Sequence, residues 1–191
     1  MTTKSLAAAV VWVSVFTAVP LFATQRGNVA ANPDALTQQD FKKRVDAYVA
    51  LHNAAVKDVG SLKPTTDSSA IKEGQNALAQ RIAAARADAK PGDLFTPEIK
   101  ARFRELLAPQ LKGEDGRDAR AIVKDDAPVS VPFKVNAVYP AGKPLPTVPA
   151  HILLNLPTLP KELEYRIIDK HLILRDTEAN LIVDYMLNAI P

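Results

Sequence analysis

Apolar residues recur every three or four positions over residues 38–59, and this spacing predicts an amphipathic helix. Its expected start is the sequence TQQD at 37–40, which resembles a capping box with Asp in place of Glu, and Gly60 is a natural stop. The apolar stripe consists of Phe41, Val45, Tyr48, Val49, His52, Val56 and Val59. His52 is interpreted as a half-buried histidine of this stripe, and the alternative is a ligand or a base.

A second helix is expected over residues 70–89, with Asp67 or Ser69 as its cap. Its apolar seam is thin and rich in alanine, and consists of Ile71, Leu78, Ile82, Ala85 and Ala89. A seam of small residues permits close packing, so we expect an antiparallel hairpin with the first helix. The basic residues elsewhere on this segment are interpreted as a solvated face; they are Arg81, Arg86 and Lys90.

The sequence TPE at 96–98 predicts the start of a third helix, because it supplies a threonine cap, a proline at the first helical position and an acid in the first turn. The stripe of this helix consists of Ile99, Phe103, Leu106 and Leu107. Residues 113–118 interrupt the pattern. Asp118 is then expected to cap one more short helix that runs through Lys124.

Hydrophobic residues occupy every second position from Val131 to Tyr139, which predicts a strand. The prolines at both ends make it an edge or a lone strand. Residues 140–149 form a proline-rich connector. A short helix is expected over 149–155, with Ile152, Leu153 and Leu156 facing inward. His151, near its start, is expected to be exposed.

Residues 162–187 predict a three-stranded antiparallel meander. A two-residue turn at 169–170 brings the alternating positions of the first two strands into one register. The expected pairs are Ile167 with Leu172, Tyr165 with Leu174, Arg166 with Ile173, Ile168 with His171, and Glu164 with Arg175 as a cross-strand ion pair.

A four-residue turn at 177–180 leads to the third strand. One sheet face is then predicted to be apolar and buried, with the members Leu163, Tyr165, Ile167, Leu172, Leu174, Leu181, Val183 and Tyr185. The opposite, charged face is predicted to contain Ile182, Asp184 and Met186 from the third strand.

These elements predict an α+β protein, with an N-terminal helical hairpin and a third helix, followed by a small antiparallel β-meander with one short helix. The expected regions are a signal peptide at 1–23, a helical region at 24–126 and a small β-rich region at 127–191 packed on the helices. The composition, 47% hydrophobic and 24% charged, is that of an ordinary folded globule.

The N-terminus has the pattern of a secretory signal, because Lys4 precedes an uncharged apolar stretch, residues 5–23, that ends in small residues. Cleavage after Ala23 is the first expectation and cleavage after Ala31 the second. The alternative is an uncleaved membrane anchor, since about 19 apolar residues just span a bilayer. The chain is therefore expected to be exported, to the periplasm or beyond the cell.

Composition excludes several classes of chemistry. The chain has no cysteine, which excludes disulfides, thiolate metal sites and a thiol nucleophile, and its three histidines are too far apart in sequence for a metal motif. The net charge of +3 is not concentrated in a basic patch, so nucleic acid is not an expected partner. No phosphate loop, nucleophile elbow or HExxH motif is present. No cofactor or metal is therefore expected.

The charged face of the meander is the candidate binding surface, and its members are Glu164, Arg166, His171, Arg175 and Asp184. The alternative interpretation is a solvated ladder of ion pairs. A catalytic or metal cluster of Asp169, His171, Asp176 and Asp184 is not expected, because the predicted register does not bring these side chains together.

The chain resembles a family of uncharacterised exported bacterial proteins. The resemblance rests on FKKRVDAYVALH at 41–52, ALAQRIAAARADAKPGDLFTP at 77–97, VNAVYP at 135–140 and, above all, LPTLPKELEYRIIDKHLILRDTEANLIVDYM at 156–186. It covers most of the chain after the signal and implies no particular activity. The terminal strands alone are similar to those of a periplasmic nickel/cobalt-homeostasis family.

The sequence thus favours a non-enzymatic accessory or binding module of the cell envelope with a protein partner there. A hydrolase-like envelope enzyme with an unrecognised site is the alternative, and a periplasmic metal-homeostasis protein is the third interpretation. Contact with a membrane is expected only through an uncleaved N-terminus.

Overall fold

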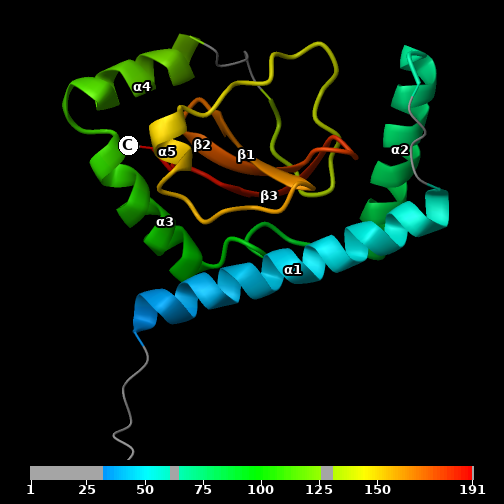
Figure 1. Cartoon of the computed structure of the whole chain (residues 1–191), viewed down its shortest axis with the longest axis horizontal. Helices are drawn as coiled ribbons and strands as arrows, with labels where there is room; N and C mark the ends of the chain where they lie inside the picture. Colours follow the sequence, from blue (N-terminus) through cyan, green and yellow to red (C-terminus); the bar gives the residue numbers. More distant parts are fainter. Residues whose placement is uncertain (1–31, 61–64, 126–130, 191) are drawn as a thin grey trace, which may run out of the picture. The chain divides into compact units, whose positions relative to one another are not determined.

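The computed structural model describes residues 32–60, 65–125 and 131–190. Over these residues five helices precede a three-stranded antiparallel sheet of order β1-β2-β3, which confirms the predicted α+β class (Figure 1). Residues 31–191 form one compact unit. The predicted signal peptide lies outside the described residues, and the described part of the chain contains no helix long and apolar enough to cross a membrane.

The first helix, α1 (Pro33–Val59), starts before the predicted capping box. Asn32 caps it, because the Asn32 side chain accepts a hydrogen bond of 3.0 Å from the Asp34 amide, and Pro33 occupies the first helical position. Thr37 lies inside the helix and donates its hydroxyl to the Pro33 carbonyl. The interpretation of residues 37–40 as a helix start is therefore wrong.

The second helix, α2 (Ser68–Ala85), is capped by Asp67, one of the two predicted caps, and it contacts α1 as the expected helical pair. It ends before the predicted residue 89. Arg86, predicted to be solvated, lies instead over the Tyr48 ring, with its guanidinium carbon 5.1 Å from the ring centroid. It also donates 3.2 Å to the Val183 carbonyl, so it joins α2 to the sheet.

The third helix, α3 (Pro97–Gln110), begins as predicted, because Thr96 accepts a hydrogen bond from the Ile99 amide. The fourth, α4 (Gly113–Asp125), includes the sequence that was expected to interrupt the helical pattern. Gly113 allows this early start because its φ of 72° is accessible to glycine. The prediction that this helix begins only at Asp118 is wrong.

The strands β1 (Leu163–Ile168) and β2 (His171–Asp176) pair in the predicted register throughout, including Glu164 opposite Arg175. The two-residue turn at 169–170 is confirmed and places Asp169 at a φ of 54°. Local alternation and a tight turn together specify the register, because a slip by one residue would exchange the two faces.

The third strand, β3 (Leu181–Met186), departs from the prediction at a β-bulge. The register shifts between Leu174 and Arg175, so two residues of β3 occupy the space of one. Beyond the bulge Met186 pairs with Leu172 and Tyr185 with Ile173. Met186 is therefore on the core face and Tyr185 on the opposite face, the reverse of the predicted assignment.

The main core lies between one sheet face and the helices α1, α2 and α3 (Figure 1). The seven other residues predicted for the apolar face all belong to this core. An aromatic cluster forms its centre, where the Phe103 ring meets Phe41 at 5.1 Å, Phe95 at 5.4 Å and Tyr165 at 6.0 Å between centroids. Edge-to-face contacts of this kind add to the hydrophobic stabilisation of the core.

The opposite sheet face is covered by the chain at 131–145 and is not a solvated charged surface. This covering chain is not the predicted strand, since its only bridge to β3 among the described residues joins Val138 to Leu181. Asn136, with a φ of 63°, interrupts the extended backbone while its amide donates to the Ile182 carbonyl. A smaller apolar cluster fills this face and consists of Val131, Tyr139, Ile168, Ile173 and Ile182.

The short helix α5 (Ala150–Leu153) is present as expected, but only part of its predicted inner face is buried. Ile152 and Leu156 belong to the main core, whereas Leu153 is 42% exposed. His151 is half-buried instead of exposed.

Candidate functional site

Two residues of α1 reach one carboxylate at the end of β2 and form a buried polar centre with it. Tyr48 donates its hydroxyl to Asp176 Oδ2 at 2.8 Å, and His52 Nδ1 lies 2.6 Å from the same oxygen. His52 is 1% exposed and Asp176 is fully buried. Because Tyr48 and His52 are four residues apart on one helical face, α1 can present both to a single acceptor.

The other Asp176 oxygen organises the turn that joins β2 to β3. Asp176 Oδ1 accepts hydrogen bonds from the backbone amides of Glu178, at 3.0 Å, and Ala179, at 2.8 Å. The buried carboxylate is thus bound at both oxygens by donors, so its polar atoms are satisfied inside the core. This centre fastens α1 to the β2–β3 turn.

The surroundings of this centre raise the pKa of both His52 and Tyr48. The hydrogen bond to Asp176 raises the pKa of His52; burial opposes this, and the charges of Asp176, Glu178 and Glu162 raise it further. Burial, together with Asp176, raises the pKa of Tyr48 far above its usual range, so its hydroxyl remains a donor.

The imidazole and the carboxylate have the arrangement of an acid–base pair in which a carboxylate orients a histidine. The second nitrogen, His52 Nε2, faces Glu178 Oε2 at 3.5 Å. The ring is 1% exposed, so the pair has no open access for a substrate in this structure. Its geometry supports a structural and electrostatic role.

Asp184 does not belong to the predicted binding face. It is fully buried and accepts hydrogen bonds from the amides of Gly92 at 2.9 Å, Leu94 at 2.8 Å and Phe95 at 2.8 Å. The bulge in β3 places it opposite Leu174 on the core face, where it anchors the loop before α3. The prediction that Asp184 shares a face with Glu164, Arg166 and Arg175 is therefore wrong, because the bulge turns its side chain to the other face.

His171 is also separate from the other predicted residues. Its Nδ1 accepts a hydrogen bond of 3.0 Å from the Asn188 amide, and its ring meets Phe133 edge to face at 5.1 Å. Burial lowers the pKa of His171, so it is neutral near pH 7. His171 therefore belongs to an aromatic contact at one end of the sheet.

Glu164, Arg166 and Arg175 do form one network on the second face. Glu164 pairs with Arg166 at 2.5 Å and also with Arg175, as the predicted cross-strand ion pair. Arg175 further donates to the Asn180 side chain at 2.7 Å, and Arg166 donates to the Pro146 carbonyl at 3.1 Å. The side chains of the three charged residues are only 13–22% exposed, so the network is largely covered.

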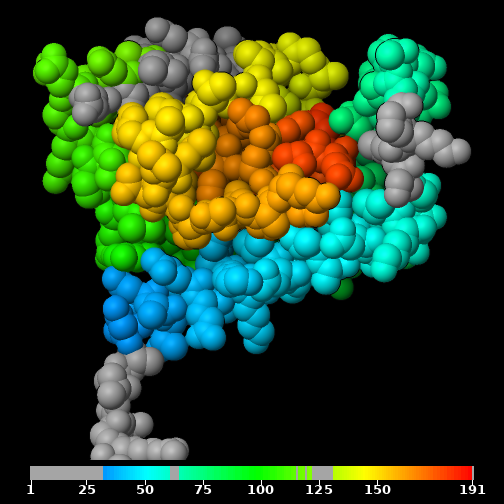
Figure 2. Space-filling view, in the orientation of Figure 1, coloured from blue at the N-terminus to red at the C-terminus, as the bar shows by residue number. Residues whose placement is uncertain are grey.

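Two surface hollows adjoin the proline-containing segment at 157–160, which we call the strap. One, of 410 Å³, extends between the strap, residues 147–148 and β1, where Glu164 and Arg166 contribute to its wall. The other, of 440 Å³, lies between the strap and α1, where its apolar wall includes Phe41 and Val45. Figure 2 shows the strap region, in orange, bordering α1 in blue.

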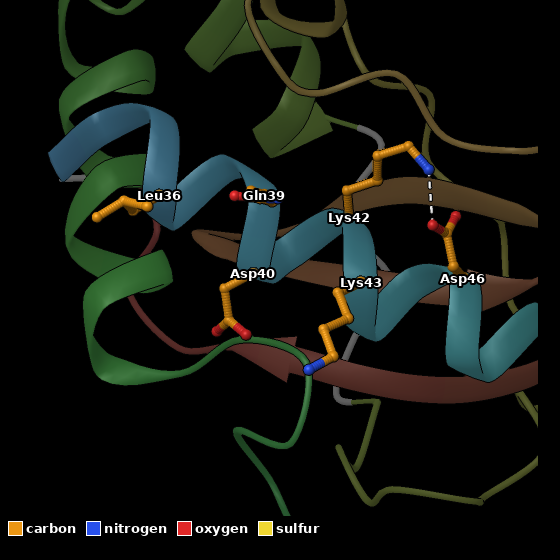
Figure 3. Close-up of a pocket in the computed structure, with 6 residues that line it drawn as sticks. All are labelled: Leu36, Gln39, Asp40, Lys42, Lys43 and Asp46. Carbon is orange, nitrogen blue, oxygen red and sulfur yellow. Dashed lines mark hydrogen bonds and ion pairs between the residues drawn. The ribbon is translucent and has the colours of Figure 1, made fainter. Parts of the chain in front are cut away.

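The strap is held by the sheet beneath it, because the Tyr165 hydroxyl donates to the Pro157 carbonyl at 3.0 Å. A third hollow, of 530 Å³, is drawn in Figure 3. Its described lining comes from α1 alone, and the Lys42 ammonium points to Asp46 at 2.6 Å. A single convex helix offers one wall only, so this hollow is a weaker candidate than those beside the strap.

No sequence pattern connects His52 to Asp176. The pair is separated by 124 positions, and no pattern indicates which helix crosses the end of which strand. The available signal was a histidine and a tyrosine on an otherwise apolar stripe, which implies a buried polar partner elsewhere in the chain. Asp176 and Asp184 bind different parts of the chain: Asp176 binds α1 and its own turn, and Asp184 binds the 92–95 loop.

Within the described residues no group of three or more histidine, aspartate or glutamate side chains is placed to hold a metal ion. Comparison of the chain with protein-family models, curated proteins and solved structures found no match.

Proposed function

We propose that this chain is an exported protein of the cell envelope that binds a partner protein and does not catalyse a reaction. The observation that carries the proposal is the pair of hollows beside the strap, which have apolar walls and charged rims. The predicted signal sequence at 1–23 and the resemblance to exported proteins support the location.

The hollows suit an extended segment of a partner better than a small polar substrate. Each is bounded by apolar residues, among them Leu159, which contributes to both. Recognition of an extended peptide commonly uses pockets for side chains along a groove. At the rim of the hollow beside β1, Glu164 and Arg166 pair with each other at 2.5 Å, so this rim offers a partner one charge of each sign.

The enzyme alternative rests on the His52–Asp176 pair. Catalysis there would require His52 Nε2 to reach a substrate, and this atom is buried next to Glu178. The binding proposal needs no such opening of the fold, which is why we favour it.

The binding proposal is tested by a substitution at Thr158, an exposed residue of the strap that contributes to both hollows. Thr158→Arg places a long side chain there without removing any core contact. A photo-reactive residue at Leu153, which is 42% exposed and lines the hollow beside β1, should crosslink to one defined envelope protein, and Thr158→Arg should abolish that crosslink. The matched control is Gln80→Arg, which introduces the same side chain at an exposed position of α2.

A panel of hydrolase substrates distinguishes the enzyme. Turnover that survives Thr158→Arg and disappears with His52→Gln would replace the binding proposal by the enzyme alternative. Equal crosslinking by the Thr158→Arg and Gln80→Arg variants would also contradict it.

Export is tested separately by the mass of the protein recovered from the periplasm or the medium. Trp12 is the single tryptophan and lies within residues 1–23, so the processed protein should show tyrosine emission alone. A recovered protein whose mass still includes residues 1–23 would contradict cleavage after Ala23.

A further inference from the structure

His52 lies between two carboxylates that differ in their exposure. On one side Asp176 is fully buried and lies 2.6 Å from Nδ1. On the other, Glu178 lies 3.5 Å from Nε2 and its side chain is 45% exposed. The two ring nitrogens therefore face partners of the same charge, one inside the core and one at the surface.

Counting the donors shows what a proton adds to this arrangement. A neutral imidazole has one N–H, and the short contact to Asp176 places it on Nδ1. In that state Nε2 is an acceptor and directs its lone pair at the Glu178 carboxylate, which is repulsive. A second proton, on Nε2, converts the same contact into an ion pair. The contact with Glu178 thus changes sign with the protonation of His52, whereas the contact with Asp176 does not.

We propose that His52 is the switching residue of a proton-operated latch between α1 and the β2–β3 turn, and that Glu178 is the arm that closes on the protonated ring. Asp176 is the fixed half of the latch, since its four hydrogen bonds hold it to Tyr48, His52, Glu178 and Ala179 in the described structure. This inference goes beyond the proposed binding function and does not depend on it.

All the ionisable groups facing the ring favour the closed state. Asp176 comes from β2, Glu178 from the turn and Glu162 from the chain just before β1, and each stabilises the imidazolium. Tyr48, from α1 itself, is held neutral by burial, and the guanidinium of Arg86, the residue after α2, lies over the Tyr48 ring. The hydrogen bond to Asp176 and the charges of these carboxylates raise the pKa of His52. As the pH falls, His52 therefore takes up its second proton, and the latch closes, at a higher pH than an ordinary histidine would.

The turn is placed to transmit the change. Thr177 donates its amide to the Glu162 carbonyl at 2.9 Å, and its hydroxyl donates 3.1 Å to the Lys161 carbonyl. Residues 161–162 directly follow the strap, so the turn that carries Glu178 is tied to the chain at the base of β1. Opening the latch removes one of the contacts that hold this turn to α1.

The test is an NMR titration of the three histidines in the purified protein, with the backbone amides of Glu178 and Ala179 followed in the same samples. The variant is Glu178→Gln, which removes the charge at a partly exposed position and retains the shape. The matched control is Glu73→Gln, an exposed glutamate of α2. We expect the variant to lower the proton affinity of His52 about two- to fivefold, the effect of a partly exposed ion pair, and the control to leave it unchanged.

In the unmodified protein the amide signals of Glu178 and Ala179 should titrate with the midpoint of His52, and this coupled titration should weaken in Glu178→Gln. A merely structural histidine would give the same titration of these amides in the unmodified protein and in Glu178→Gln, because both amides donate to Asp176, which contacts His52 in either case. The latch is overturned if His52 does not titrate above its ordinary range, if the turn amides ignore its titration, or if the Glu178→Gln and Glu73→Gln variants give the same His52 midpoint.

Discussion

The two faces of the meander differ in how each handles its charged residues. On the face toward the helices, the buried Asp176 is bound by Tyr48, His52 and the backbone of its own turn. On the other face, Glu164 is bound by two guanidinium groups and retains 22% exposure. A carboxylate is therefore held on each face by a different kind of donor.

Burial, more than ion pairing, therefore decides how much each carboxylate contributes to the free energy of unfolding. The Asp176 partners would be left buried and unsatisfied by its removal, whereas the Glu164 partners have other acceptors, Pro146 for Arg166 and Asn180 for Arg175. Three substitutions and one pH series test this difference between the two faces.

The largest effect is expected for Asp176→Ala. It leaves two backbone amides, the Tyr48 hydroxyl and His52 without their acceptor, and breaking a buried polar pair costs about 3–5 kcal/mol. The free energy of unfolding in urea measures this loss. Glu164→Ala is the matched variant on the other face and should cost clearly less. Equal losses would remove the distinction between the two faces.

Leu174→Ala is expected to follow, with a loss of about 3 kcal/mol in unfolding free energy, within the range for a fully buried leucine. Leu174 has no exposed surface and packs beneath helices that cannot easily move into the space. Ile173→Ala on the other face should cost nearer to about 2 kcal/mol, because the covering chain is a loop and can relax. Leu154→Ala, at a position 85% exposed, is the control and should change little.

A pH series addresses the helix-facing side alone. The pKa of His52 is raised in the folded state, so folding takes up a proton and the resulting stability is fully present below about pH 6.5, the ordinary value. It is lost as the pH rises through the folded pKa. Unfolding free energy should therefore fall as the pH rises above about 6.5. The fall should be smaller in Glu178→Gln and absent in His52→Gln, and an unchanged slope in both would contradict the assignment.

The contrast between the two hairpins shows what the sequence could predict. In β1 and β2 the alternation and the short turn determine the register, and every predicted pair is present. In β3 the residues LIVDYM are apolar on both faces, so alternation carries no information about a bulge. The bulge is favoured by Asp184, whose carboxylate accepts hydrogen bonds from three amides of the 92–95 loop. These partners are about 90 positions away along the chain, so no local pattern indicates them.

The same limit applies to the other elements and to the site. The alternation at 131–139 resembles that of a strand because an extended chain that lies on a sheet also buries alternate residues. Asn136, with its positive φ, interrupts the extended backbone and prevents a continuous strand. The stripe on α1 was predicted, and so was the position of Asp176 on β2. Their meeting was not, because it depends on how the helix crosses the sheet, and short sequence patterns contain no information on that crossing.

The smallest effect is expected for Glu164→Gln on the face away from the helices. The two arginines raise the acidity of Glu164: burial alone would raise its pKa, but their hydrogen bonds and charges outweigh it and lower the pKa. A carboxamide retains one acceptor oxygen and the shape, so the change removes little beyond the charge, and a partly exposed ion pair contributes about 0.2–1 kcal/mol. Unfolding in urea at low salt and again at 1 M salt separates this contribution, because screening acts on the ion pairs and not on the shape. A loss comparable to that of Asp176→Ala, or one that salt does not reduce, would show that this face depends on its charges as strongly as the helix-facing side depends on its buried carboxylate.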